Sequence, residues 1–164
     1  MDATILRRAA EQAIARRPEL LWLQDARSRA VETFVREGFP TIAEEDWRYT
    51  DLSRAASLIE SSALKAAPGA TAQQLDTLRD LLIPGAGGIA AVFMGGILLP
   101  ELCRMPSTPG VTITRLLQAS PSMRGALAKR IGDTKESRGR LATLNTALLQ
   151  DGLVIDIAAG TMLE

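Results

Sequence analysis

Histidine is absent from this sequence of 164 residues, and cysteine occurs once, at Cys103. Without histidine the chain cannot build Ser-His-Asp or Cys-His nucleophiles, or the imidazole sites that hold most zinc and non-haem iron ions. One cysteine cannot form an intramolecular disulfide or supply the three or four ligands of a cluster or a structural zinc. The composition therefore predicts a chain that is not an enzyme by itself and holds no metal or cofactor of its own.

Aromatic residues and excess charge are also scarce. Aromatics make up 4% of the sequence, so the core must be aliphatic, and 19 basic residues balance 19 acidic ones. A net charge of zero creates no overall field that would attract nucleic acid or an acidic membrane. The longest apolar stretch, Ile89 to Leu99, is interrupted by two glycines and is too short to span a bilayer, and the N-terminus has no apolar signal segment. We expect a cytoplasmic protein that binds neither nucleic acid nor membrane.

The first 38 residues carry helical periodicity. Apolar residues recur at three- and four-residue steps over 2–17 and again after Pro18, which suits the first position of a second helix. Arg27 interrupts the second apolar stripe, although its aliphatic stem can lie along it, and Gly38 is a good left-handed stop. This pattern predicts an amphipathic helical hairpin or arm, which could pack on the rest of the protein or on a second copy of the chain.

The remaining sequence mixes helical and strand patterns. Two apolar runs on either side of Gly95–Gly96 predict a β-hairpin. Further helices are expected at 71–82, 121–131 and 140–149, and further strands at 111–114 and 153–157. The fold class is therefore α+β. The expected division is a helical arm and junction at 1–60, a small mixed subdomain at 61–150 and a final strand at 151–164.

The junction after Gly38 concentrates the scarce aromatic residues. Thr41 and Glu44 have the spacing of a capping box, so a short helical turn should begin there. Trp47, Arg48 and Tyr49 follow. Trp47 and Tyr49 can plug the junction between the arm and the rest of the chain. Alternatively, Trp47, Arg48 and Tyr49 contact a partner, because these residue types dominate the energetics of protein interfaces.

Other candidate sites are weaker. The glycines at 85–88 follow a helix and precede a strand, the reverse of a dinucleotide fingerprint. The acids at 44–46 are explained by the dipole of a helical turn, and Cys103 has the apolar neighbours of a packed thiol. The segment 104–140 carries eight basic residues against Asp133 and Glu136, either as a solvated surface or as a docking surface for an acidic partner. The basic residues are Arg104, Arg115, Arg124, Lys129, Arg130, Lys135, Arg138 and Arg140.

Four segments in one order resemble the SufD family of iron–sulfur cluster assembly proteins. The more specific two are GFPTIAEEDWRYTDL at 38–52 and LATLNTALLQDGLVIDIAAGTMLE at 141–164. The weaker two are VFMGGILLPEL at 92–102, where Met94 and Gly95 replace the usual polar turn start, and PGVTITRL at 109–116. SufB proteins are similar in their core, but the Trp-Arg-Tyr-Thr signature favours SufD.

The resemblance implies a much longer protein, with this chain as its N-terminal region ending where a right-handed parallel β-helix would begin. In such proteins the β-helix pairs with SufB, the C-terminal domain binds the SufC ATPase, and the complete complex handles the iron–sulfur cluster. None of the family's proposed cluster-handling residues matches a position in this sequence. The expected role is therefore a non-catalytic domain for partner contacts and assembly. The alternative is a stand-alone helical adaptor that docks an acidic partner through residues 104–140.

Overall fold

The computed structural model describes residues 3–62, 71–81, 88–131 and 139–162. These residues form six α-helices, short 3₁₀ turns and two small antiparallel sheets, so the predicted α+β class is confirmed. Two compact units are present. The helical unit comprises Met1–Ala66 and Ser120–Gln150, and the sheet unit comprises Ala67–Ala119 and Asp151–Glu164. None of the helices in the described ranges combines the length and the apolar character needed to cross a membrane.

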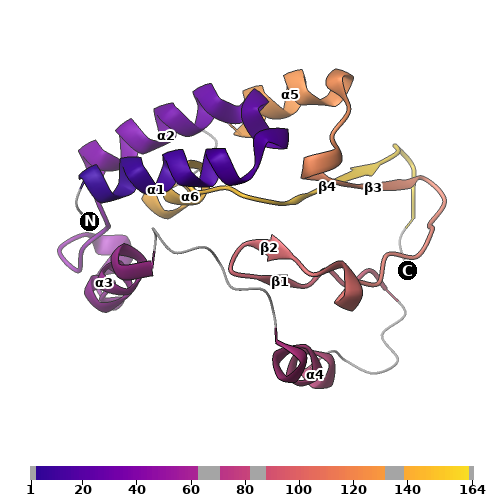
Figure 1. The fold of residues 1–164 in the computed structure, drawn as a ribbon, viewed down its shortest axis with the longest axis horizontal. Helices are drawn as coiled ribbons and strands as arrows, with labels where there is room; N and C mark the ends of the chain where they lie inside the picture. Colours follow the sequence, from indigo (N-terminus) through magenta and orange to yellow (C-terminus); the bar gives the residue numbers. More distant parts are fainter. Residues whose placement is uncertain (1–2, 63–70, 82–87, 132–138, 163–164) are drawn as a thin grey trace. The chain divides into compact units, whose positions relative to one another are not determined.

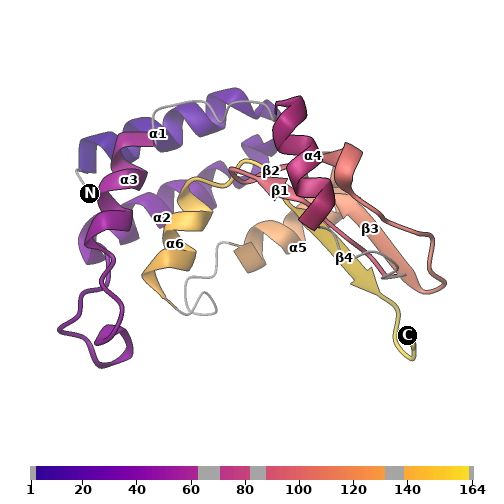
Figure 2. The ribbon, with the colours of Figure 1, turned by 90° about the horizontal axis from the view of Figure 1, so that it is seen from below.

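The helical unit begins with two antiparallel helices. Helix α1 (Ala3–Arg16) is followed by a 3₁₀ turn, η1 (Pro18–Leu23), and α2 (Gln24–Glu37) runs back alongside α1 (Figures 1 and 2). Pro18 therefore opens a 3₁₀ turn, and the second α-helix begins six residues later than the proline signal indicated. Gly38 ends α2 with φ of +68°, and its N–H donates to the carbonyl of Phe34 at 2.8 Å.

A third helix completes the core of this unit. Helix α6 (Arg140–Ala147) packs against α2, and its apolar side meets the stripes of both arm helices. The Phe34 and Phe39 rings meet edge to face with centroids 5.0 Å apart. The buried residues of this core are Leu6, Ala10, Ala30, Val31, Phe34, Leu144 and Ala147. The core is mainly aliphatic, as the low aromatic content predicted.

Two more helices belong to the helical unit. Helix α3 (Ser53–Ser62) is preceded by Asp51, whose carboxylate accepts the Ser53 N–H at 2.9 Å. This hydrogen bond, together with one from the Ser53 hydroxyl, lowers the pKa of Asp51 below its usual value. Helix α5 (Pro121–Ile131) contacts η1 and α2. Helices α5 and α6 thus pack with the helical arm, which differs from the expected division at 1–60, 61–150 and 151–164 because α6 supplies part of the arm's core.

The sheet unit opens with helix α4 (Ala72–Leu81), which has the predicted capping box. The Thr71 N–H donates to Gln74 Oε1 at 2.9 Å, and the Gln74 N–H donates to Thr71 Oγ1 at 3.2 Å. Strands β1 (Phe93–Met94) and β2 (Ile97–Leu98) then form the predicted hairpin. Gly95 and Gly96 have φ of +56° and +80°, the left-handed values that a two-residue hairpin turn requires. The 3₁₀ turn η3 (Pro100–Leu102) follows.

The second sheet joins two strands that are distant in sequence. Strand β3 (Val111–Arg115) pairs antiparallel with β4 (Leu153–Ile157), with Val111 opposite Ile157 and Arg115 opposite Leu153. The 3₁₀ turn η4 (Leu116–Gln118) follows β3. Both strands were predicted from sequence, but their pairing was not. In the described residues β4 pairs only with β3, and this two-stranded pairing does not test whether a β-helix begins at residues 151–164. That expectation remains a prediction. Most of the expected connection at 61–69 and of the glycines at 85–88 lies outside the described residues.

Gly110, at the turn into β3, is expected to tolerate no side chain. It has φ of +76°, and a Cβ there would collide with the Thr161 side chain. Gly110→Ala should therefore lower the free energy of unfolding by at least about 1–2 kcal/mol, measured by urea denaturation. The matched control is Gly125→Ala inside α5, where a Cβ meets open space. That change should raise stability by up to about 1 kcal/mol, and equal midpoints for both variants would contradict the prediction.

Candidate functional site

The segment 38–52 forms a compact turn at the end of α2. Phe39 anchors its start on Phe34, and the Thr41 N–H donates to Glu44 Oε1 at 2.9 Å, as the capping-box spacing predicted. A 3₁₀ turn, η2 (Glu45–Trp47), follows directly. Local hydrogen bonds therefore determine the course of this segment, with acidic side chains on its first turn, where the helix dipole favours them.

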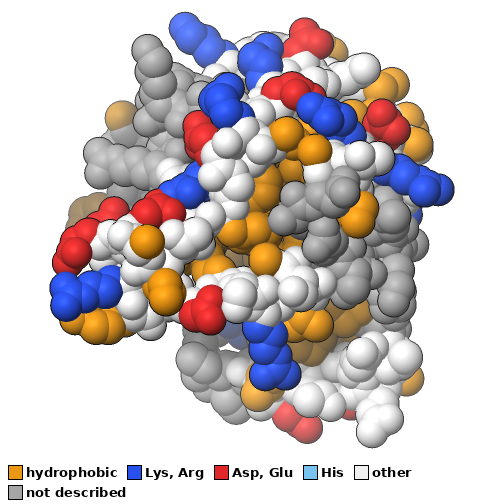
Figure 3. All heavy atoms as spheres, turned by 90° about the vertical axis from the view of Figure 1, so that its left-hand side faces the viewer, with side chains coloured by type: hydrophobic (Ala, Val, Ile, Leu, Met, Phe, Trp, Pro, Cys, Tyr) orange, Lys and Arg blue, Asp and Glu red, His pale blue; other side chains and the backbone are white. Residues whose placement is uncertain are grey.

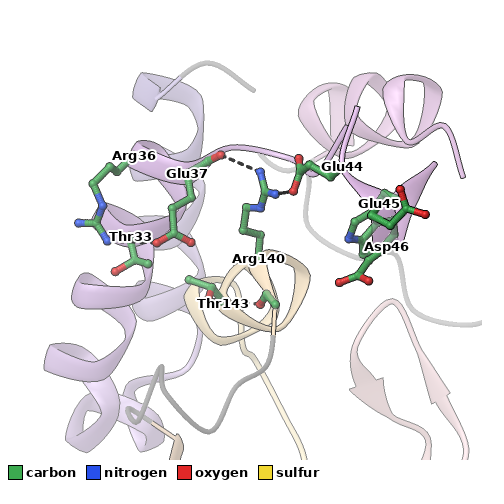
Figure 4. A pocket seen from close by; sticks show the side chains of 10 residues that line it. Thr33, Arg36, Glu37, Glu44, Glu45, Asp46, Arg140 and Thr143 are labelled. Carbon is green, nitrogen blue, oxygen red and sulfur yellow. Dashed lines mark hydrogen bonds and ion pairs between the residues drawn. The ribbon is translucent and has the colours of Figure 1, made fainter. Parts of the chain in front are cut away.

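Arg140, the first residue of α6, ties this segment to the core. Its guanidinium forms an ion pair with Glu44 and donates to the backbone carbonyls of Glu37 at 3.2 Å and Phe39 at 3.3 Å. Figure 4 shows Arg140 reaching toward Glu44 and the end of α2, with Glu45 and Asp46 on the neighbouring turn. A cation at the C-terminus of α2 satisfies carbonyls that the helix itself leaves unpaired. Arg140 therefore fixes where η2 lies relative to α2 and α6.

These elements border a cavity of about 490 Å³ that is open to solvent. Four acidic side chains and two arginines line it, together with two threonines, Trp47 and Gly139. The charged residues are Arg36, Glu37, Glu44, Glu45, Asp46 and Arg140. Arg36 and Glu37 form an ion pair at 3.2 Å, and Arg140 pairs with Glu44. The lining therefore carries excess negative charge on η2, so the cavity suits a cationic side chain better than an anion.

The acids of this cavity do not form a metal site. Within the parts of the chain that the structure describes, no three His, Cys, Asp or Glu side chains are grouped so that they could hold a metal ion. Cys103 is in the sheet unit, where its thiol donates to the Leu99 carbonyl at 3.1 Å and accepts the Val92 N–H at 3.4 Å. The thiol is thus used in local packing, in keeping with its apolar sequence context.

The three residues singled out from sequence have different environments. Trp47 lines the cavity and is half-buried. Arg48 is exposed, approaches Glu45 at 3.5 Å and lies 5.3 Å from the centre of the Tyr49 ring. Tyr49 is 89% exposed. It therefore does not plug the junction between the arm and the rest of the chain, which was one of the two interpretations drawn from the sequence. A role of Trp47, Arg48 and Tyr49 in partner contact remains a prediction.

Sequence reasoning missed Arg140 as part of this site and counted it only in the basic segment. One signal was available, since a basic residue at the first position of a helix opposes the helix dipole and calls for a specific partner. Two other arginines of this segment also have partners. Arg104 donates a hydrogen bond to the Gly88 carbonyl at 2.9 Å, and Arg115 forms an ion pair with Asp151 at 2.5 Å. Lys135 and Arg138 lie outside the described residues. The segment 104–140 is also divided between the two units, with Arg104 and Arg115 in the sheet unit and the other described basic residues in the helical unit.

Opposite charges are interspersed on the face shown in Figure 3, where Lys and Arg lie among Asp and Glu. Apolar side chains are exposed between them. This distribution agrees with the zero net charge of the sequence and gives no strongly basic surface on that face.

Comparison with known proteins adds two matches. Residues 6–59 match the family model described as the SufBD protein N-terminal region. The chain is 26% identical over 155 residues to an iron–sulfur cluster assembly SufBD family protein of Synechocystis, an alignment that covers 94% of this chain and 33% of the relative. The chain thus spans about a third of the length of the curated relative it matches. No solved structure matches it significantly. Both matches are to proteins of the SufB/SufD family, and neither distinguishes SufD from SufB.

Proposed function

We propose that this chain is the N-terminal domain of a SufD-like subunit of the SUF iron–sulfur cluster assembly scaffold, and that it acts in the cytoplasm through partner contacts and assembly. The observation that carries this proposal is the match of residues 6–59 to the SufBD N-terminal region, which includes most of α1, all of α2 and the whole of the 38–52 segment. The choice of SufD over SufB rests on the Trp-Arg-Tyr-Thr signature at 47–50.

The domain is proposed to be non-catalytic. The sequence contains no histidine, and the single thiol, Cys103, is engaged by backbone groups of its own unit. Iron–sulfur chemistry would then depend on ligands from other parts of the complex. The purified chain is expected to hold no stoichiometric iron and to show no turnover. Tightly bound iron, measured by elemental analysis after desalting, would contradict this part of the proposal.

The proposed partners are SufB-like and SufC-like subunits, reached through the full-length protein. Within this chain, the surface best suited to contribute is the 47–49 cluster beside the acidic cavity. Tyr49 is exposed, with the Arg48 guanidinium 5.3 Å from the centre of its ring, so both side chains are accessible to a partner. Trp47 and the excess acids on η2 would favour a partner that presents a basic side chain next to an apolar surface.

A capture experiment tests the proposed contact surface. The 164-residue chain and the full-length protein are each used to capture SufB-like and SufC-like subunits, with Trp47→Ala/Tyr49→Ala as the variant. We expect the double variant to weaken capture about tenfold or more, the effect of losing one interface hot spot. Leu81→Ala, an exposed apolar residue on α4, is the control and should change nothing. Capture by the full-length protein alone would place the contacts outside this chain.

A further inference from the structure

The segment 41–52, which carries the proposed contact surface, has no buried side chain to hold it in place. Within the described range 3–62, none of the residues from 41 to 52 is buried, although Pro40 directly before them is. Hydrogen bonds within the segment are local, such as that from the Trp47 N–H to the Glu44 carbonyl at 2.9 Å. Local hydrogen bonds determine the shape of a turn but not where the turn lies on the protein. The position of the segment must therefore come from contacts with the rest of the helical unit.

Arg140, the first residue of α6, makes such contacts with three acceptors. Its guanidinium donates to the backbone carbonyls of Glu37 and Phe39, at the entry to the segment. It also forms an ion pair with Glu44, directly before η2 (Figure 4). Glu44 accepts the Thr41 N–H through Oε1 as well, so one carboxylate joins the capping box of the segment to α6.

The surroundings of Arg140 make this connection effective. The Arg140 and Glu44 side chains are 24% and 37% exposed, so water screens their attraction less than that of a fully exposed ion pair. A guanidinium presents its N–H donors in a planar fork and can serve several acceptors at once. Arg36, the other arginine of the cavity lining, is 68% exposed and pairs with its sequence neighbour Glu37 within α2. That second pair therefore does not connect two elements.

We propose that Arg140 is a positioning residue for partner contact. By holding the segment 41–52 on α2 and α6, it sets the affinity of the 47–49 cluster through the segment rather than through a contact of its own. This inference rests on the proposed function, since it takes the cluster to be a contact surface. A segment that is already held in place loses less conformational entropy when a partner binds. The contact surface would then depend on α6, which lies outside residues 6–59 of the family match.

Arg140→Met tests this inference in the 164-residue chain. We expect the backbone order parameter of Trp47, measured by nitrogen relaxation, to fall from about 0.85 to below about 0.6. Trp22, on η1, is the internal control and should keep its value, which shows that the fold is retained. Capture of the SufB-like and SufC-like subunits should weaken about tenfold, because the segment would then be ordered only on binding. An unchanged order parameter for Trp47 overturns the inference.

Arg36→Met separates the effect of position from the effect of charge. Both substitutions remove one positive charge from the lining of the same cavity. If charge alone mattered, each variant would tighten the capture of a partner with a basic side chain, because the lining would become more negative. Positioning instead predicts opposite signs, with weaker capture for Arg140→Met and slightly tighter capture for Arg36→Met. Changes of the same sign and size in both variants overturn the inference.

Glu44→Gln breaks the ion pair from the other side and decides the question if Arg140→Met does not fold. Glutamine can still accept the Thr41 N–H, so the capping box remains while the charge attraction to Arg140 is lost. We expect the order parameter of Trp47 to fall in this variant as well, although less than in Arg140→Met, and an unchanged value overturns the inference.

The capture results also distinguish the inference from the proposed function. If the unmodified chain captures neither subunit, the proposed contact surface fails, and the contact role of Arg140 fails with it. If the unmodified chain and Arg140→Met capture the subunits equally well, the contact surface stands and only the role of Arg140 is overturned.

Discussion

Asp151→Ala is expected to lower the free energy of unfolding of the sheet unit by about 3 kcal/mol. The Asp151 side chain is 0% exposed and accepts hydrogen bonds from Arg115 Nη2 at 2.5 Å, the Leu98 N–H at 3.1 Å and the Gly152 N–H at 2.9 Å. Removing one member of a buried ion pair typically costs about 3–5 kcal/mol, and the partial exposure of Arg115 favours the lower end. Urea denaturation monitored on β3–β4 amides measures the loss.

The same carboxylate should make the sheet unit sensitive to acid. Burial raises the pKa of Asp151, but hydrogen bonds from Arg115 and from the Gly152 and Leu98 amides outweigh burial and hold this pKa below its usual value. A carboxyl whose pKa is depressed by folding stabilises the protein above its unfolded pKa of about 3.9. That contribution is lost as the pH falls through the lower, folded pKa. Stability should therefore fall more steeply below about pH 4 in the unmodified chain than in Asp151→Asn.

Asp156→Asn is the matched control for the acid prediction, because Asp156 lies on β4 with an exposed side chain. Its acid profile should follow that of the unmodified chain. If the stability of Asp151→Asn still fell as steeply below about pH 4, other carboxyl groups would be the cause of this loss of stability. An Asp151→Ala variant with an unchanged urea midpoint would show that the hydrogen bonds of this carboxylate contribute nothing net to stability.

Phe34→Ala is expected to lower the free energy of unfolding of the helical unit by about 3–5 kcal/mol, an effect as large as that of Asp151→Ala on the sheet unit. Phe34 is 2% exposed and packs in the core formed by α1, α2 and α6, with its ring edge-to-face against Phe39. The substitution removes buried apolar surface and leaves a cavity that rigid helices cannot close. Thermal unfolding followed by circular dichroism at a helix wavelength measures the change.

Phe93→Ala removes the same ring from a position that is 42% exposed on β1, and should cost less than about 1 kcal/mol. Equal losses for Phe34→Ala and Phe93→Ala would contradict the assignment of the core. The packing of α2 on α6 also aligns Glu37 with Arg140, so Phe34→Ala should loosen the cavity at η2. In the capture experiment, any binding that depends on the 47–49 cluster should weaken in this variant at temperatures where it remains folded.

Local features of the fold could be predicted from the sequence, because each is determined by neighbouring residues. The apolar periodicity of the first 37 residues predicted α1 and α2, and Gly38 marked the end of α2. Thr41 with Glu44 predicted the turn that carries Trp47. Gly95–Gly96 predicted the β1–β2 hairpin, since few other residues adopt its positive φ values. The resemblance to the SufD family also depended on short contiguous motifs.

Tertiary structure alone decided which of these elements pack together and which charges are buried. Asp151 meets Arg115 across 36 residues, and Arg140 meets Glu44 across 96, distances over which no local pattern specifies a partner. Helices α5 and α6 join the arm, with Leu144 and Ala147 of α6 in its apolar core, and β4 pairs with β3 although these two helices lie between the strands in the sequence. Arg27 is fully buried, although its position in the apolar stripe predicted that only its aliphatic stem would be covered. The sequence by itself determined the elements and the chemistry they exclude, because these follow from residue type and short-range spacing. Trp47, Arg48 and Tyr49 could be singled out from the sequence because they are contiguous, whereas the cavity at η2 and the buried ion pair of Asp151 with Arg115 followed only from the structure, because each brings together side chains that the chain order separates.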